Sequence, residues 1–264
     1  MGAVPLASFS VTRSWNNTFV KLGYNYLNTT DVMSIDAEIS SDAYDRNPAN
    51  IEHTNRPLVS QTLYGNRHRV LGSASKRFNW GNPKFGTTAT VFFEYAEGNR
   101  YSYTYSGDIN NNGSSLNDII YVPTDSEIDQ MDFSGEAASQ RTALKAFIAQ
   151  DDYLSGRKGD YAEKYGALTP WYNTWDVRIL QDVGLNNDQK FQLSLDILNA
   201  GNLINSKWGI RKTATNTSLF QPIGVTVTKG NPVYSFDSQL TETFQNDFSI
   251  ISRWRLQLGL RFVF

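Results

Sequence analysis

The segment that begins at Asp108 has the clearest metal-binding spacing in the chain. Residues 108–113 read Asp-Ile-Asn-Asn-Asn-Gly, which matches the first half of a D-x-N-x-N-G calcium loop. Oxygen ligands at alternate positions can converge on one hard cation, and glycine allows the sharp bend. Ile119 stands where a glutamate would complete the loop, so Asp118 or Asn117 would have to substitute. The spacing predicts either an Asn/Gly-rich turn that leaves a strand or a calcium site formed by Asp108, Asn110, Asn112 and Asp118.

Other residue types that could carry catalysis do not form a recognisable site. Residues 73–76 read Ser-Ala-Ser-Lys, an S-x-x-K match, but it lies within a strand pattern and lacks the motifs that accompany it in penicillin-binding enzymes. The two histidines, His53 and His68, have no metalloenzyme spacing. The paired acids Asp151 and Asp152 are typical of a solvated loop. We therefore expect a protein that is not an enzyme.

Composition narrows the possible partners. The 264 residues include 24 basic and 26 acidic side chains, a net charge of -2, so no basic surplus points to nucleic acid. Cysteine is absent, which excludes a disulfide framework. No apolar run approaches the ~20 residues of a transmembrane helix, and the mean hydropathy is -0.44. These values do not exclude a membrane barrel, because barrel strands expose apolar side chains only at alternate positions.

The last twelve residues carry the clearest structural pattern. From Arg253 onward, large apolar residues alternate with Arg253, Arg255, Gln257, Gly259 and Arg261. Lipid on one face and a watery lumen on the other would produce this pattern. An amphipathic strand at the edge of a soluble sheet is the alternative. The apolar positions, which would also form the signal for barrel assembly, are Trp254, Leu256, Leu258, Leu260, Phe262 and Phe264.

Period-2 alternation predicts six further strands. They lie near residues 7–15, 20–26, 67–80, 85–95, 171–185 and 190–199, and the fourth would continue toward Tyr101, Tyr103 and Tyr105. Short turns near 16–17, 81–83 and 186–189 alternate with long polar segments near 35–65, 106–170 and 207–249. Outer-membrane barrels alternate short periplasmic turns with long extracellular loops in this way. We expect the long segments to be extracellular, with the three tyrosines, Trp171 and Trp175 in an aromatic girdle near the outer rim.

Two further expectations concern the loops and the lumen. Helix-forming residues from Gly135 to Gln150 predict a short helix inside the 106–170 loop. On the polar side of the strands, we expect lumen-facing arginines that pair with Asp176, Asp182 and Asp196 on neighbouring strands. These arginines are Arg178, Arg253, Arg255 and Arg261.

The chain is expected to be a fragment of a larger barrel. Residues 1–5 (Met-Gly-Ala-Val-Pro) lack the basic start and apolar core of a signal peptide, which an exported protein needs. Seven strands are an odd number, whereas bacterial single-chain barrels have an even number. The fold class expected is therefore all-β, an antiparallel transmembrane β-barrel of which about seven C-terminal strands are present.

Several segments resemble the C-terminal end of TonB-dependent outer-membrane receptors. They are Trp175–Arg178, Leu195–Asn205 and Leu256–Phe264, and the whole chain, residues 1–264, would correspond to the last third or so of such a receptor. Residues 103–108 and 118–123 look most like the Oar-like branch of Bacteroidetes and relatives. The closing strand is generic to outer-membrane barrels, whereas residues 198–205 and 107–123 are more specific.

The resemblance implies a 22-stranded barrel around a plug domain, with import across the outer membrane of a Gram-negative bacterium. Energy would come from the TonB–ExbB–ExbD complex through an N-terminal part that this chain lacks. The final residue, Phe264, would be read by the barrel assembly machinery. The partners would then be outer-membrane lipid, the TonB–ExbB–ExbD complex, the barrel assembly machinery and an unidentified small-molecule, glycan or peptide substrate. Two other classes remain: a structural or adhesive barrel without transport, and a soluble all-β ligand-binding module.

Overall fold

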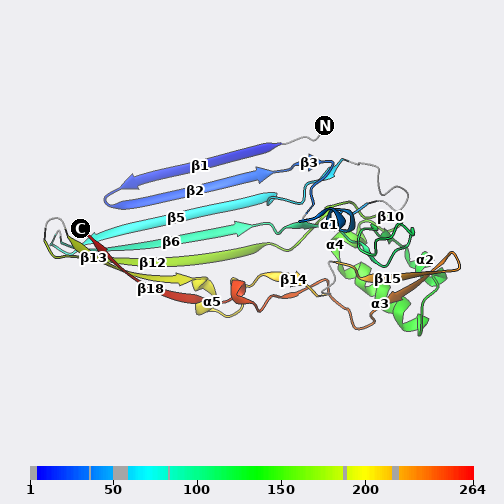
Figure 1. Ribbon diagram of the computed structural model, residues 1–264. Helices are drawn as coiled ribbons and strands as arrows, with labels where there is room; N and C mark the ends of the chain where they lie inside the picture. Colours follow the sequence, from blue (N-terminus) through cyan, green and yellow to red (C-terminus); the bar gives the residue numbers. More distant parts are fainter. Residues whose placement is uncertain (1–4, 36, 50–58, 83, 187–188, 216–219) are drawn as a thin grey trace.

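The computed structural model describes residues 5–35, 37–49, 59–82, 84–186, 189–215 and 220–264. Its main element is an antiparallel sheet of seven strands that follow one another in chain order (Figure 1). All seven strands predicted from the sequence are confirmed. They are β1 (Leu6–Trp15), β2 (Thr18–Leu27), β5 (His68–Asn79), β6 (Phe85–Ala96), β12 (Tyr172–Gly184), β13 (Lys190–Leu198) and β18 (Arg255–Val263).

Short connections join the strands in pairs at one end of the sheet. Asn16 and Asn17 join β1 to β2 with φ angles of 42° and 61°, the left-handed conformation that a two-residue hairpin turn requires. Gly81, with φ 76°, lies in the β5–β6 connection. The predicted turn residues Pro83, Asn187 and Asp188 lie outside the described residues.

One face of the sheet is apolar across all seven strands, and we call it the apolar face. The register places Val11, Leu22, Gly72, Phe93 and Trp175 in one row across five strands. Because successive side chains in a strand point to opposite faces, the alternate residues on every strand share this side. Its apolar members include Phe9, Val11, Trp15, Val20, Leu22, Tyr24, Val70, Ala74, Phe78, Phe85, Ala89, Val91, Phe93, Tyr95, Trp175, Val177, Ile179, Val183, Phe191, Leu193, Leu195, Ile197, Leu256, Leu258, Leu260 and Phe262.

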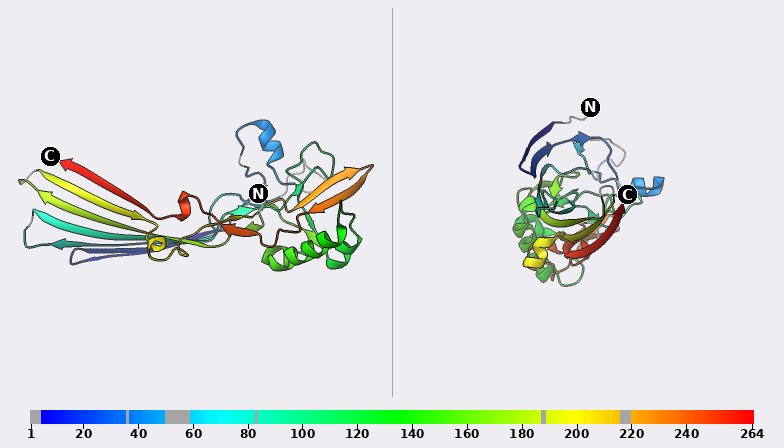
Figure 2. Two further views of the ribbon diagram at one scale, coloured as in Figure 1. Left: turned by 90° about the horizontal axis from the view of Figure 1, so that it is seen from below. Right: turned by 90° about the vertical axis from the view of Figure 1, so that its left-hand side faces the viewer.

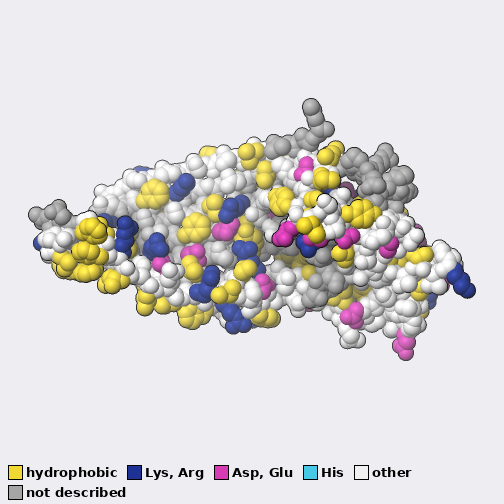
Figure 3. Space-filling view, in the orientation of Figure 1, with side chains coloured by type: hydrophobic (Ala, Val, Ile, Leu, Met, Phe, Trp, Pro, Cys, Tyr) yellow, Lys and Arg dark blue, Asp and Glu magenta, His cyan; other side chains and the backbone are white. Residues whose placement is uncertain are grey.

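The opposite face is lined mainly by hydroxyl, amide and charged side chains, and we call it the polar face. Basic and acidic groups lie side by side over the strands, while hydrophobic groups gather at the end with the short turns (Figure 3). The polar face includes Ser8, Ser10, Thr12, Lys21, Asn25, Arg69, Ser73, Ser75, Arg77, Thr88, Thr90, Glu94, Thr174, Asp176, Arg178, Asp182, Lys190, Gln192, Ser194, Asp196, Arg255, Gln257 and Arg261.

The three long connections, 28–67, 97–171 and 199–254, all lie at the other end of the sheet (Figure 1). We call them together the loop lobe. The prediction that long connections share one end is confirmed. The elements of the lobe are β3 (Thr30–Asp31), α1 (Ser40–Asp45), β4 (Ser60–Gln61), β7 (Arg100–Tyr101), β8 (Tyr105–Ser106), β9 (Tyr121–Val122), α2 (Asp125–Gln130), α3 (Ala137–Gln150), α4 (Asp152–Ser155), β10 (Asp160–Tyr161), β11 (Ala167–Leu168), α5 (Ala200–Ile204), β14 (Lys212–Ala214), β15 (Ile223–Thr228), β16 (Asn231–Phe236), β17 (Phe244–Asn246) and a 3₁₀ helix (Ile250–Ser252).

The buried core lies in the loop lobe rather than between the sheet and another layer. The predicted helix within 135–150 is confirmed as α3, which buries Leu144, Phe147 and Ile148 at helical spacing. The expectation for three of the tyrosines is wrong. Strand β6 ends at Ala96, and Tyr101, Tyr103 and Tyr105 are buried in the lobe core instead of forming an exposed girdle. A polar loop of this length can bury aromatic residues because it folds back on itself and on 220–244.

The sheet is curved when seen end-on, with β1 and β18 at its two edges (Figure 2). Within the described residues, each edge strand pairs with a neighbour on one side only. The seven strands therefore form a curved open sheet and not a closed ring. The chain is therefore mostly β, with all five α-helices of the described residues in the connections at one end. Within the described part of the chain, no helix combines the length and apolar character needed to cross a membrane.

Candidate functional site

The four predicted calcium ligands lie together in the loop after β8. Both carboxylate oxygens of Asp108 accept hydrogen bonds from backbone N–H groups, those of Asn112 at 2.9 Å and Gly113 at 2.8 Å. The side-chain oxygen of Asn110 also accepts from the Asn112 N–H, at 3.0 Å. The loop therefore closes on itself through side-chain oxygens that cap its own backbone.

Asp118 holds the base of this loop from a fully buried position. Its carboxylate accepts a hydrogen bond from the Ile109 N–H at 3.1 Å, and its backbone carbonyl accepts from the Tyr105 N–H at 2.8 Å. Burial raises the pKa of Asp118 above its ordinary value, the Ile109 and Asn110 N–H groups oppose the shift, and the nearby charge of Asp108 adds to it. The residue thus fastens the loop to β8.

The geometry supports the turn interpretation of this segment more strongly than the metal interpretation. The oxygens that would face a cation already accept backbone N–H groups. Among the described residues, no three His, Cys, Asp or Glu side chains are grouped as metal ligands would be. Calcium binding stays a prediction that a titration can test.

The polar face brings one of the predicted lumen arginines to a predicted partner. Arg178 on β12 forms a bidentate ion pair with Asp196 on β13, in which Nη2 lies 3.1 Å from Oδ2. Arg255 and Arg261 lie on the polar face of β18 without an ion pair to any described residue. Arg253 precedes that strand, and its Nε donates to the Phe248 carbonyl at 2.9 Å. The prediction that Arg253 belongs to the last strand is wrong, because Arg253 is the residue at which the 3₁₀ helix Ile250–Ser252 ends.

Asp182 is the centre of a second charged group, and its arginine partner, Arg77, is not one of the four that were predicted. Its carboxylate accepts from Arg77 on β5 at 2.8 Å and from Gln192 on β13 at 2.8 Å, and Lys190 lies 3.5 Å away. The third predicted acid, Asp176, accepts the Asn199 N–H at 2.8 Å instead of an arginine. Paired charges of this kind suit a face that meets water or other polar groups.

The S-x-x-K match is not a catalytic arrangement. Ser73 and Lys76 are three residues apart on β5, so their side chains point to opposite faces of the sheet. Lys76 donates to the Asn16 carbonyl at 2.7 Å in the neighbouring turn. His68 bonds the Tyr24 hydroxyl at 2.8 Å and stacks on Trp171, whereas His53 lies outside the described residues.

A buried carboxylate in the lobe core joins two of the three long connections. Asp151 accepts the Tyr103 hydroxyl at 2.5 Å and the Thr243 hydroxyl at 2.6 Å, and the Tyr153 and Leu154 N–H groups complete its shell. The Tyr101 hydroxyl donates to that of Tyr103 at 3.1 Å. Burial raises the pKa of both tyrosines, so both phenols stay protonated and can donate. The network fixes the shape of the lobe.

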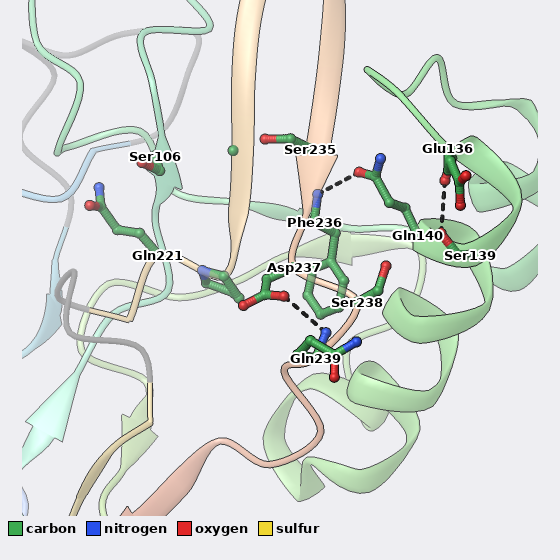
Figure 4. A pocket seen from close by; sticks show the side chains of 12 residues that line it. Ser106, Glu136, Ser139, Gln140, Gln221, Ser235, Phe236, Asp237, Ser238 and Gln239 are labelled. Atoms are coloured by element: carbon green, nitrogen blue, oxygen red, sulfur yellow. Dashed lines mark hydrogen bonds between the residues drawn. The ribbon is translucent and has the colours of Figure 1, made fainter.

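A polar cavity of about 680 Å³ opens between α3, β15 and β16 of the lobe. Figure 4 shows side chains from these elements around it. Gln140 accepts the Phe236 N–H at 2.8 Å, and Gln221 donates to the Tyr105 carbonyl at 2.7 Å, so both amides already support the lobe. The charged side chains of the lining are Glu136 and Asp237, both acidic. The cavity can accept a neutral polar ligand but is unsuited to an anion.

Comparisons with known proteins add no relative. No protein-family model, no curated protein and no solved structure matches this chain.

Proposed function

We propose that this chain is the C-terminal barrel portion of a TonB-dependent receptor that imports a nutrient across the outer membrane. The observation that carries the proposal is the exposed and mainly apolar face that extends over all seven strands. Leu258 and Leu260, at its edge, are 75% and 68% exposed. Water-soluble proteins rarely leave an apolar patch of this extent open to solvent.

Strand length supports a membrane crossing. The seven strands have nine to thirteen residues, and a tilted transmembrane strand needs roughly 9–11. A soluble sheet more often has strands of roughly five or six residues.

Aromatic residues at both ends of the apolar face support the same assignment. At the lobe end, Tyr95 stacks on Trp171 with 4.8 Å between the ring centres, and Phe93 stacks on Trp175 with 4.9 Å between the ring centres. At the turn end, the ring centres of Phe191 and Phe262 lie 5.0 Å apart. The apolar-face positions of β6 and β18 between these ends are aliphatic or small (Thr87, Ala89, Val91; Leu256, Leu258, Leu260). Two aromatic girdles around an aliphatic band are typical of outer-membrane barrels.

The few charged groups on the apolar face lie near its turn end. Lys76 reaches the Asn16 carbonyl, and the Arg13 guanidinium lies 5.5 Å from the Trp15 ring. Long basic side chains near a membrane surface direct their charge to the interface in this manner. Their position agrees with a lipid-covered band that ends near the turns.

In the proposed receptor, the polar face lines the barrel interior and the loop lobe is extracellular. The edges of β1 and β18 would pair with further strands of a 22-stranded barrel, because an open edge is not tolerated in hydrocarbon. The plug, the TonB–ExbB–ExbD contact and recognition of Phe264 by the assembly machinery belong to the same proposal. The lobe would supply the substrate contacts.

The detergent requirement of the chain tests the membrane part of this proposal. We expect the chain to stay in solution only in the presence of micelles and to aggregate when the detergent is removed. Leu258→Asp should weaken its partition into micelles, since it places a charge in the apolar face, while Gln257→Asp on the opposite face should not. Behaviour as a stable monomer without detergent would instead favour a soluble all-β binding module. Import of substrate in cells distinguishes a transporter from a structural barrel.

A further inference from the structure

A second cavity, which we call the rim cavity, lies where the strands meet the loop lobe. It has a volume of about 520 Å³. Its walls come from residues 98–101 after β6, from Thr169, Pro170 and Tyr172 before and at the start of β12, and from 211–214 around β14, with Phe220 and Gln245. Tyr172 belongs to the polar side of the sheet, since it is paired with Ala96 and its hydroxyl donates to Glu94 at 3.2 Å. The cavity therefore opens on the side of the proposed barrel interior.

The described lining of the rim cavity carries three cationic side chains and no acidic one. Arg100 is 8% exposed, and its guanidinium donates to neutral oxygens only, the Tyr165 carbonyl at 3.2 Å and the Asn28 amide at 3.3 Å. The carboxylate of Glu97, whose charge acts on Arg100, forms an ion pair with Arg67 at 2.7 Å. Burial and the charge of Arg67 lower the pKa of Arg100, and the charge of Glu97 opposes this shift without cancelling it. An anion in the cavity would offset both effects.

Arg211 is held at the opposite wall with a donor left free. Its backbone N–H donates to the Ser252 hydroxyl at 3.0 Å, and its guanidinium carbon lies 4.0 Å from the centre of the Tyr172 ring. The Nε atom is buried and has no hydrogen-bond acceptor among the described residues. Lys212 follows on β14 and forms no ion pair with the described part of the chain. A buried donor without a partner is destabilising, so an acceptor that reached Nε would stabilise this arrangement.

We propose that the rim cavity binds a small organic anion with more than one carboxylate or phosphate group. Two guanidinium groups offer planar forks that match such oxygens, and Lys212 adds a mobile charge at the entrance. The ring of Tyr172 holds the plane of the Arg211 guanidinium in a fixed orientation. The volume lies within the range that holds a whole small molecule.

This inference rests on the proposed function, because it makes the bound anion the substrate class of the receptor. A lipid phosphate has the same oxygen chemistry and is the other source of such a ligand. The position on the polar side of the sheet favours a soluble anion, since lipid would cover the apolar face.

Calorimetric titration of the full chain in a neutral detergent tests the site, with citrate as the probe and glycerol as the uncharged control. We expect citrate to bind and glycerol to give no heat of binding. Arg211→Gln should weaken citrate binding roughly tenfold or more, because a charged hydrogen bond contributes about 1.5–3 kcal/mol. Lys212→Gln should weaken it several-fold. The matched control Lys229→Gln, in the β15–β16 turn, should leave it unchanged.

Equal citrate affinity in the wild type and in Arg211→Gln, or no citrate binding at all, would overturn the site. Binding of dihexanoyl phosphatidic acid but not of citrate would overturn the assignment to a soluble substrate. The two proposals fail separately. A chain that needs detergent but ignores citrate refutes only the anion site, whereas a detergent-free monomer that binds citrate refutes only the membrane function.

Discussion

Arg77 on β5 reaches across β6 to form an ion pair of 2.8 Å with Asp182 on β12. The crossing depends on Gly86, which stands opposite Asp182 in the intervening strand. A Cβ atom at Gly86 would overlap the Arg77 guanidinium, which would have to move. The absence of a side chain at one position of β6 thus allows two strands that are not neighbours to share a charge pair.

Gly86→Ala should therefore destabilise the sheet by displacing Arg77. We expect a loss of about 1 kcal/mol in the free energy of unfolding, the upper range for a partly exposed ion pair. Gly23→Ala on the same polar face is the matched control, because its Cβ would meet nothing closer than 3.8 Å. Urea unfolding of both variants in micelles measures the difference. Equal midpoints for the two variants would contradict the role of Gly86.

The buried Asp118 should make the stability of the loop lobe depend on pH. Its pKa is raised in the folded chain, mainly by burial, so the folded state holds this proton to a higher pH than the unfolded state. The stabilising contribution of the protonated form is complete below the unfolded pKa of about 3.9 and is lost as pH rises through the folded pKa. The wild type should lose stability relative to Asp118→Asn as pH rises from about 4 through the raised folded pKa of Asp118.

Thermal unfolding of the two proteins across this range measures that difference. The isosteric change Asp237→Asn, at an exposed aspartate of the same lobe, is the control for the removal of a carboxylate. A constant difference between wild type and Asp118→Asn at all pH values would show that the carboxylate does not titrate in this window.

The hydroxyl of Tyr103 should contribute to lobe stability through Asp151. Tyr103→Phe removes the 2.5 Å hydrogen bond to the carboxylate and leaves the buried Tyr101 hydroxyl without its acceptor. We expect a loss of about 1–3 kcal/mol. Tyr64→Phe is the control, since Tyr64 is 60% exposed and water can replace its bond to the Ile35 carbonyl. Near-ultraviolet circular dichroism during thermal unfolding compares them, and similar losses would refute the buried network.

A calcium titration decides between the two interpretations of the Asp108 loop. Because its carboxylate already accepts two backbone N–H groups, we expect Asp108→Ala to lower the melting temperature by the same amount with and without millimolar calcium. Stabilisation of the wild type by calcium, absent in the variant, would instead establish the metal site.

The sequence predicts the strands of this protein well, because alternation is local. Leu256 to Phe262 alternate within a single strand, and Asn16 and Asn17 mark their turn by residue type alone. The helix α3 is likewise visible from its own residues. What the sequence did not predict depends on contacts between distant segments. Asp182 was expected to pair with one of four named arginines, but its partner is Arg77, 105 residues away, and that pairing requires the register of three strands.

The tyrosines show that burial within the loops also depends on contacts between distant segments, which the sequence does not predict. Tyr101, Tyr103 and Tyr105 alternate like strand residues, which suggested a continuation of β6. Their ring contacts come from another connection: Phe220 lies against Tyr101 and Tyr103, Phe244 against Tyr101, and Tyr234 against Tyr105. The rim cavity was not predicted for the same reason, since Arg100 and Arg211 belong to different connections.

The claim that one face of the sheet meets lipid and the other meets water can be tested position by position along β18. The chain has no cysteine, so single cysteines at 256–261, each labelled with a nitroxide, can be read one at a time in micelles. We expect positions 256, 258 and 260 to be accessible to oxygen dissolved in the micelle, and 257, 259 and 261 to be accessible to a water-soluble nickel complex. Uniform accessibility to the nickel complex at all six positions would contradict it.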